Sequence, residues 1–193
     1  MTNATAPLTT IGMLLFPRLT HLDLTGPHEV LARLPNTHIL LMAESLDPVV
    51  SETGLTITPD CRLVDAPPLD IVFVPGGAGI NALLENQTVL DFLRQQGAQA
   101  RYVTAVCTGS LVLAAAGLLD GYRATTHWRY LPLLAQFGIE TVNERVVIDR
   151  NRITSGGITA GIDFSLTLAA QLHGEKVARI IQLQLEYDPA PPF

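Results

Sequence analysis

Short apolar runs alternate with alanine- and leucine-rich or amphipathic segments along most of the chain, which predicts strands followed by helices. The run at 70–74 is continuously apolar, a pattern typical of a parallel strand that is covered on both faces. Residues 149–151 are a turn signal between two further strands. The predicted strands cover residues 10–16, 38–43, 49–50, 54–58, 70–74, 102–106, 123–126, 141–149 and 152–154, with a small hairpin formed by 49–50 and 54–58.

Helical patterns fill the segments between these strands. Gly26 and Pro27 predict the start of the first helix, because proline is favoured in the first turn of a helix. The second helical region is expected to break near Asn86. The predicted helices cover residues 26–34, 80–98, 108–119, 128–137, 158–172 and 176–186, and the proline-rich segment 188–193 cannot be helical.

This order predicts the α/β fold class, with one open, mostly parallel sheet and helices on both of its faces. In such folds ligands bind beyond the carboxyl ends of the strands. The loops after three of the predicted strands bring four candidate residues to that edge: Asp23, Gly76, Gly77 and Cys107.

Composition narrows the picture. The 193 residues suit one domain, which we expect over 10–193 after a flexible tail at 1–9. Charged residues make up only 16%, which suggests that part of the surface is covered in an oligomer. The net charge of −6 argues against nucleic-acid binding, and the longest apolar run, 111–119, is too short to cross a membrane. The two cysteines form neither a disulfide framework nor a metal-ligand pattern, so we expect a reducing cytoplasm.

Cys107 lies where a β-branched apolar run gives way to small polar residues and then to a helical pattern. A thiol at the start of a helix is close to free N–H groups, which favour the nucleophilic thiolate. The alternative is a buried cysteine that acts as a small hydrophobic residue. We expect Cys61, in a turn-like stretch, to have no chemical role.

A cysteine nucleophile also needs a proton carrier and donors for developing negative charge. Asp23 lies between leucines, so burial could keep its carboxyl protonated, although it could equally cap a helix. The backbone N–H groups of Gly77 and Thr108 could form an oxyanion pocket, although Gly76-Gly77 could also be only a turn.

His127 follows a predicted strand and could lie near the same pocket as a base, or serve as a hydrogen-bonded structural histidine. The Thr108 hydroxyl could bond the thiol or a ligand, or cap the next helix. Trp128 and Phe164 are expected in the core.

Taken together, these segments resemble the DJ-1/PfpI superfamily over residues 11–193. The motifs that carry the resemblance are LDLTGP at 22–27, VPGG at 74–77, AVCTGS at 105–110, RATTHW at 123–128, GGITAGID at 156–163 and QLEY at 184–187. The resemblance implies a flavodoxin-like three-layer sandwich, a homodimer, and a strained cysteine at a nucleophile elbow.

Within the superfamily the chain resembles the isonitrile hydratases, which add water to an isonitrile to give an N-substituted formamide. That likeness implies Cys107 as nucleophile, Asp23 as its acid/base partner and Thr108 as a supporting hydroxyl, with no metal or organic cofactor. The peptidase members carry a histidine where this chain has Thr108, and DJ-1 and the glyoxalase-type members have a glutamate where it has Asp23. The first difference argues against peptidase activity, and the second argues against a glyoxalase-type activity.

Two other functions stay open from the sequence. Similar domains form the N-terminal halves of AraC-type transcription regulators, where they sense ligands, and a DNA-binding domain in a longer gene product would favour that interpretation. A redox-responsive stress protein, in which Cys107 oxidises to a sulfinate, is the other alternative.

Overall fold

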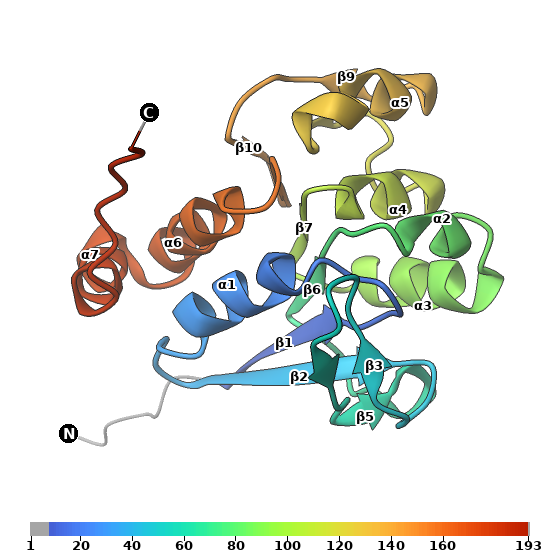
Figure 1. Cartoon of the computed structure of the whole chain (residues 1–193), viewed down its shortest axis with the longest axis horizontal. Helices are drawn as coiled ribbons and strands as arrows, with labels where there is room; N and C mark the ends of the chain where they lie inside the picture. Colours follow the sequence, from blue (N-terminus) through green and yellow to red (C-terminus); the bar gives the residue numbers. More distant parts are fainter. Residues whose placement is uncertain (1–7, 193) are drawn as a thin grey trace.

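A seven-stranded sheet forms the centre of the protein. It is seen in a computed structural model that describes residues 8–192. The strand order is β10-β11-β7-β6-β1-β2-β5, and every neighbouring pair is parallel except β10 and β11 (Figure 1). The strands are β1 (Thr9–Leu14), β2 (Thr37–Ala43), β5 (Cys61–Arg62), β6 (Ile71–Val74), β7 (Tyr102–Val106), β10 (Val146–Asp149) and β11 (Arg152–Ser155).

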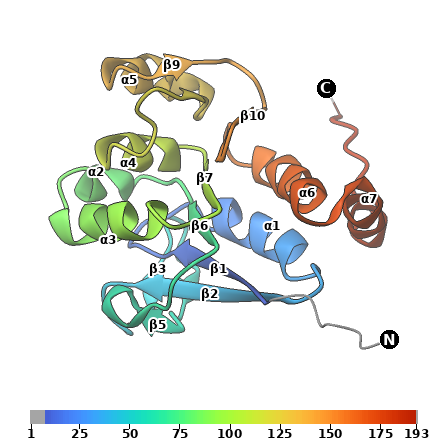
Figure 2. The ribbon, with the colours of Figure 1, turned by 180° about the vertical axis from the view of Figure 1, so that it is seen from behind.

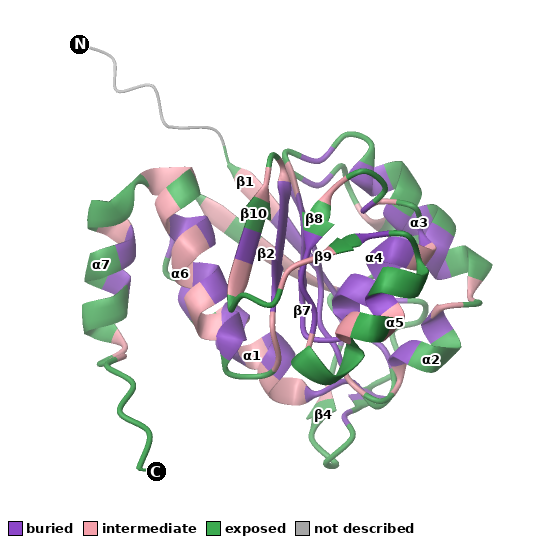
Figure 3. Cartoon of the chain, turned by 90° about the horizontal axis from the view of Figure 1, so that it is seen from above, coloured by how far each residue is buried: buried purple, intermediate pink, exposed green. Residues whose placement is uncertain are grey.

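Helices cover both faces of this sheet, which gives the predicted three layers (Figure 3). On one face lie α1 and α6, with α7 packed against α6; on the other lie α2, α3 and α4, with α5 next to α4. Figure 2 shows the same layers from behind. The helices are α1 (His21–Leu31), α2 (Ile80–Leu83), α3 (Gln87–Gly97), α4 (Gly109–Ala115), α5 (Leu131–Gln136), α6 (Ala160–His173) and α7 (Glu175–Gln184), with short 3₁₀ turns at Leu63–Asp65 and Trp128–Tyr130.

The central strands are buried on both faces, although only some of them are apolar throughout. All four residues of β6 and all four of β11 are buried, and Phe73 of β6 packs against Phe164 of α6 with ring centroids 5.7 Å apart. Two small sheets complete the fold: the predicted hairpin of β3 (Val49–Val50) and β4 (Thr56–Ile57), and the parallel pair β8 (Arg123–Ala124) and β9 (Glu140–Thr141). The predicted α/β class and its layers are therefore confirmed.

The first helix starts earlier than predicted. It begins at His21, so Pro27 lies inside it rather than in its first turn. Proline removes one helical hydrogen bond, but here its ring is buried and packs close to Gly161 of α6. Tertiary packing thus outweighs the local signal, and Asp23 belongs to the first turn of α1 instead of the preceding loop.

Other boundaries differ in smaller ways. The predicted strand at 141–149 is two strands in different sheets, and Cys61 begins an edge strand rather than lying in a turn. Helix α4 ends at Ala115, short of the predicted residue 119, because Gly117 adopts a positive φ of 74°. Residues 1–7 of the predicted tail and Phe193 lie outside the described residues, and Thr9 already belongs to β1.

The core contains most of the large apolar side chains, and Phe164 is among them as predicted. Trp128 is not, because it is 67% exposed. Its ring instead lies over His127, with centroids 5.6 Å apart. None of the described helices has the length and apolar character needed to cross a membrane.

Candidate active site

Cys107 occupies a sharp turn between β7 and α4, with a positive φ of 56°. A non-glycine residue in this region is strained and persists only where its surroundings hold it. Here the Cys107 N–H donates to the carbonyls of Ser155 and Gly156, each at 3.1 Å, and the Thr126 hydroxyl donates to the Cys107 carbonyl at 2.7 Å. Two other segments therefore hold the backbone of Cys107 at the carboxyl edge of the sheet.

Asp23 approaches this turn from the first turn of α1 and is fully buried. Its Oδ2 accepts the Gly76 N–H at 3.2 Å, whereas Oδ1 accepts no hydrogen bond from any nitrogen or oxygen of the described residues. Burial raises the pKa of Asp23 to about 7; hydrogen bonding with the Cys107 thiol and the Gly76 N–H opposes this rise, and the charge of Glu52 adds to it. The carboxyl thus titrates near neutral pH, where a group that both takes and gives protons works best.

Burial also raises the pKa of the Cys107 thiol, and the negative charge of Asp23 raises it further. Hydrogen bonding with the Thr108 N–H and hydroxyl opposes the shift without reversing it. The sequence argument that a helix start would favour the thiolate is therefore wrong for the resting protein, in which burial dominates and α4 has only 7 residues. Because the carboxyl titrates near neutral pH and the thiol only at higher pH, the pair still holds one proton after Asp23 ionises, and that proton can move between sulfur and carboxyl.

Thr108 does not cap α4 with its side chain. Its hydroxyl accepts the Gly77 N–H at 3.0 Å, and the Gly76 N–H is taken by Asp23. Of the two donors predicted for the oxyanion pocket, the Gly77 N–H is thus already donated to Thr108, whereas the Thr108 N–H faces the Cys107 thiol, so the pocket stays a prediction. A Cβ atom on Gly76 would lie 2.7 Å from the Thr108 hydroxyl and 2.8 Å from Asp23 Oδ2. Only glycine lets this loop fit between the two side chains.

His127 lies beside the thiol, across from Gly157. A Cβ atom on Gly157 would overlap His127 Cδ2 and lie 2.9 Å from Cys107 Sγ, so only glycine allows the ring and the sulfur to pack this closely against the loop. Burial lowers the pKa of His127, and the charge of Arg129 lowers it further, and both effects favour the neutral ring. Its Nδ1 accepts the Arg129 N–H at 3.3 Å.

Two residues of this site were missed by the sequence analysis. Gly157 belongs to a Gly-Gly pair directly after a strand, and the same signal had singled out Gly76 and Gly77. Glu52 has no such signal, because it is an exposed acidic residue in a hairpin turn. Among the described residues, no group of His, Cys, Asp and Glu could hold a metal ion.

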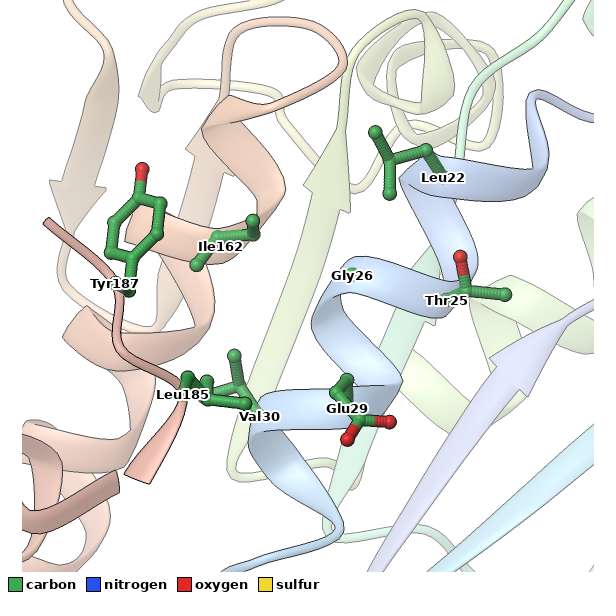
Figure 4. Close-up of a pocket in the computed structure, with 8 residues that line it drawn as sticks. All are labelled: Leu22, Thr25, Gly26, Glu29, Val30, Ile162, Leu185 and Tyr187. Atoms are coloured by element: carbon green, nitrogen blue, oxygen red, sulfur yellow. The ribbon is translucent and has the colours of Figure 1, made fainter. Parts of the chain in front are cut away.

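A separate pocket of about 370 Å³ lies between α1, α6 and the segment after α7 (Figure 4). Its lining is mostly apolar and includes Leu22, Val30, Ile162 and Leu185, but neither Asp23 nor Cys107. Asp23 instead directs its carboxyl to the Gly76 loop. One side of helix α1 thus lines this pocket, and another side of the same helix carries Asp23 toward the Cys107 turn.

A family model confirms the relationship that the motifs suggested: the DJ-1/PfpI family model matches residues 9–171. The chain belongs to the DJ-1/PfpI family. A ThiJ/PfpI family protein from Pseudomonas syringae has the same fold, with a TM-score of 0.94 and 46% identity over 96% of this chain and 78% of that one. DJ-1beta of Drosophila melanogaster matches with a TM-score of 0.85 and 26% identity over 94% of this chain and 100% of that one.

Two curated relatives of this chain are different classes of protein, an enzyme and a transcriptional regulator. The isonitrile hydratase of Pseudomonas putida is 59% identical over 183 residues, which are 95% of this chain and 80% of that protein. The HTH-type transcriptional regulator GbdR of Pseudomonas aeruginosa is 42% identical over 72% of this chain. The match covers only 38% of that regulator, so the chain spans well under half of its length.

Proposed function

We propose that this protein is an isonitrile hydratase, a hydro-lyase that converts an isonitrile and water into an N-substituted formamide. The observation that carries the proposal is the strained Cys107 thiol held against the buried carboxyl of Asp23, in a chain that is 59% identical to a curated isonitrile hydratase. A neutral thiol beside a carboxylate suits a small substrate with no leaving group, because the proton needed for addition is already in the site.

The first half of the proposed reaction is addition of the thiol. Cys107 Sγ attacks the terminal isonitrile carbon while its proton passes to Asp23, and Asp23 then gives that proton to the same carbon. A C–S and a C–H bond form, one C–N π bond is lost, and a thioimidate remains on the sulfur. A carboxyl with a pKa of about 7 can perform both transfers near neutral pH.

The second half is hydrolysis of the thioimidate. Asp23 removes a proton from a water molecule that attacks the carbon, and returns it to the nitrogen. Asp23 then takes the proton of the new hydroxyl, the C–S bond breaks, and the sulfur is reprotonated as the formamide leaves. The proposed role of Thr108 is to hold the Gly76-Gly77 loop and the sulfur in place, and His127 is proposed to contact the substrate, because its ring and the sulfur both pack against Gly157.

The direct test is conversion of an aryl isonitrile to its formamide by the purified protein and by Cys107→Ala. Cys107→Ala should lose turnover while keeping the melting temperature. Cys61→Ala is a matched control, because this second cysteine lies at the other end of the sheet on β5 and should keep full activity. Full turnover by Cys107→Ala would refute the covalent scheme.

The second candidate is a ligand-sensing domain, favoured by the match to the GbdR regulator. A sensor would bind a small molecule without converting it, so absence of formamide in the same assay, together with saturable binding, would favour it. The redox function is less well supported, because the buried thiol has a raised pKa and oxidation proceeds through the thiolate. Mass spectrometry of Cys107 after mild peroxide tests it.

The assembly and setting of the protein are also part of the proposal. We expect residues 10–193 to act as one domain and the chain to form a homodimer, in line with its 16% charged residues. Light scattering should then give twice the 20.8 kDa of one chain. We also expect a cytoplasmic enzyme that acts on small isonitriles and binds neither nucleic acid nor a membrane. Cell fractionation tests the location and membrane association, and DNA-binding assays test the absence of nucleic-acid binding.

A further inference from the structure

Glu52 lies in the turn of the β3–β4 hairpin and reaches two segments of the candidate active site. Its Oε1 accepts the hydroxyl of Thr20 at 2.7 Å, and its Oε2 accepts the N–H of Ala78 at 3.4 Å. Its own N–H donates to the carbonyl of Leu19 at 3.0 Å, which ties the hairpin turn to the same place. One exposed side chain thus joins residues that are far apart in the sequence.

The two segments that Glu52 joins are those that position the Asp23 carboxyl. Thr20 precedes α1, and its carbonyl accepts the Asp23 N–H at 3.0 Å. The Thr20 N–H donates to the Gly76 carbonyl at 2.9 Å, and the Gly76 N–H donates to Asp23 Oδ2 at 3.2 Å. Ala78 follows directly on this glycine loop, so Glu52 holds the two segments together from outside.

We propose that Glu52 is a positioning residue for the Asp23–Cys107 pair: it clamps the start of α1 to the Gly76–Ala78 loop and places a negative charge behind the buried carboxyl. The inference rests on the proposed function, in which these two groups exchange a proton. Glu52 does not touch the sulfur, so it acts only through Asp23. Because a small displacement of reacting groups can cost a large factor in rate, a clamp at this position affects the reaction.

The charge of Glu52 gives the clamp a measurable signature. A nearby negative charge disfavours a second carboxylate, and Glu52 contributes in this way to the raised pKa of Asp23. The other titratable group that acts on Asp23 is Cys107. Within the described residues no Lys or Arg forms an ion pair with Glu52, and His21 faces Thr53 of the same hairpin turn, with Nδ1 3.0 Å from the threonine hydroxyl.

The experiment separates the charge from the hydrogen bond. Glu52→Gln keeps an acceptor for the Thr20 hydroxyl but loses the charge, whereas Glu52→Ala loses both. The readout is the rate at which iodoacetamide alkylates Cys107 in the full chain as a function of pH, measured by mass spectrometry. Glu44→Gln is the matched control, because Glu44 is also exposed and also accepts a side-chain hydrogen bond, from Asn86 at 3.0 Å, away from Asp23.

During alkylation the Asp23 carboxylate takes the thiol proton, as it does in the proposed reaction, so the midpoint of the profile follows the pKa of Asp23. In Glu52→Gln this midpoint should move to lower pH, because Asp23 loses its proton more easily, while the plateau rate stays near that of the wild type. In Glu52→Ala the plateau rate of alkylation should also fall, roughly tenfold, because Asp23 and Cys107 are no longer held in their relative positions. Glu44→Gln should match the wild type in both respects.

An unshifted midpoint in Glu52→Gln would overturn the proposal, as would the same shift in Glu44→Gln. Alkylation does not require hydration of an isonitrile, so this result is independent of the proposed activity. If the wild type forms no formamide, the proposed function fails even where the alkylation profile shifts. If it forms formamide but the profile does not shift, only the role of Glu52 fails.

Discussion

At the scale of single residues, Gly157 makes the sharpest prediction. In Gly157→Ala the new methyl group would overlap His127 and crowd Cys107 Sγ at 2.9 Å, so it would push the sulfur or the ring out of its present position. We expect kcat/KM for an aryl isonitrile to fall by about 10²-fold or more, since a misplacement of about 1 Å can have that effect. Steady-state kinetics measure it.

The neighbouring glycine provides the control for this prediction. A Cβ atom on Gly156 would have no heavy atom closer than 3.9 Å, an ordinary contact distance. Gly156→Ala should therefore keep activity and stability close to the wild type. Equal losses in the two variants would mean that the Gly-Gly backbone itself matters, and would contradict the argument from close packing around the sulfur.

The chemistry of Cys107 and Asp23 could be predicted from the sequence only in part. The order of strand, small residues and helix placed the thiol at the correct edge of the sheet. It did not reveal the protonation state, because burial depends on side chains from α1 and the Gly76 loop that pack around both groups. Glu52 could not be found at all, since an exposed glutamate in a hairpin turn has no distinguishing pattern.

At the scale of elements, the start of α3 offers a test of local stability. Asn86 precedes this helix, and its side chain accepts the Val89 N–H at 3.2 Å. Asn86→Ala should lower the free energy of unfolding by about 1 kcal/mol, because that N–H loses its partner. Urea denaturation measures the change.

Glu44→Ala distinguishes the cap from the other contact of the Asn86 side chain. This variant removes the acceptor of the Asn86 amide but leaves the bond from the Val89 N–H to Asn86 in place. We expect it to retain most of the wild-type stability. A loss as large as that of Asn86→Ala would instead assign the stabilisation to the bond with Glu44.

Elements with strong local signals were predicted well. The apolar strands β6 and β7, the β3–β4 hairpin and the break before α3 all follow from residues within each segment. The start of α1 was predicted wrongly, because Pro27 is a helix-start signal that packing against α6 overrides. The division of 141–149 between two sheets depends on partners from β8 and β11, which no local pattern shows.

At the scale of the whole molecule, the buried Asp23 makes stability depend on pH. Its pKa rises from 3.8 to about 7 on folding, so the folded protein binds a proton more tightly than the unfolded chain. The resulting stabilisation is complete below about pH 3.8 and is lost as the pH rises through about 7. It amounts to about 4 kcal/mol at most, since one pKa unit corresponds to about 1.4 kcal/mol.

Asp23→Asn should remove this dependence, because an amide does not titrate. Urea unfolding at pH 5 and pH 8 should show a larger loss of stability with rising pH in the wild type than in Asp23→Asn. Asp47→Asn, which changes an exposed carboxyl, should behave as the wild type does. The same pH dependence in all three proteins would show that Asp23 is not the group responsible.

The origins of the site residues along the chain have a consequence for biosynthesis. Asp23 comes from the first helix, Cys107 from the middle of the chain, and the carbonyls that hold the cysteine turn from Ser155 and Gly156. A ribosome must therefore deliver more than three quarters of the polypeptide before the sulfur has its final neighbours. Until then no proton partner is fixed beside the Cys107 thiol. The reactivity of this thiol therefore develops late in folding, and its appearance can report that folding is complete.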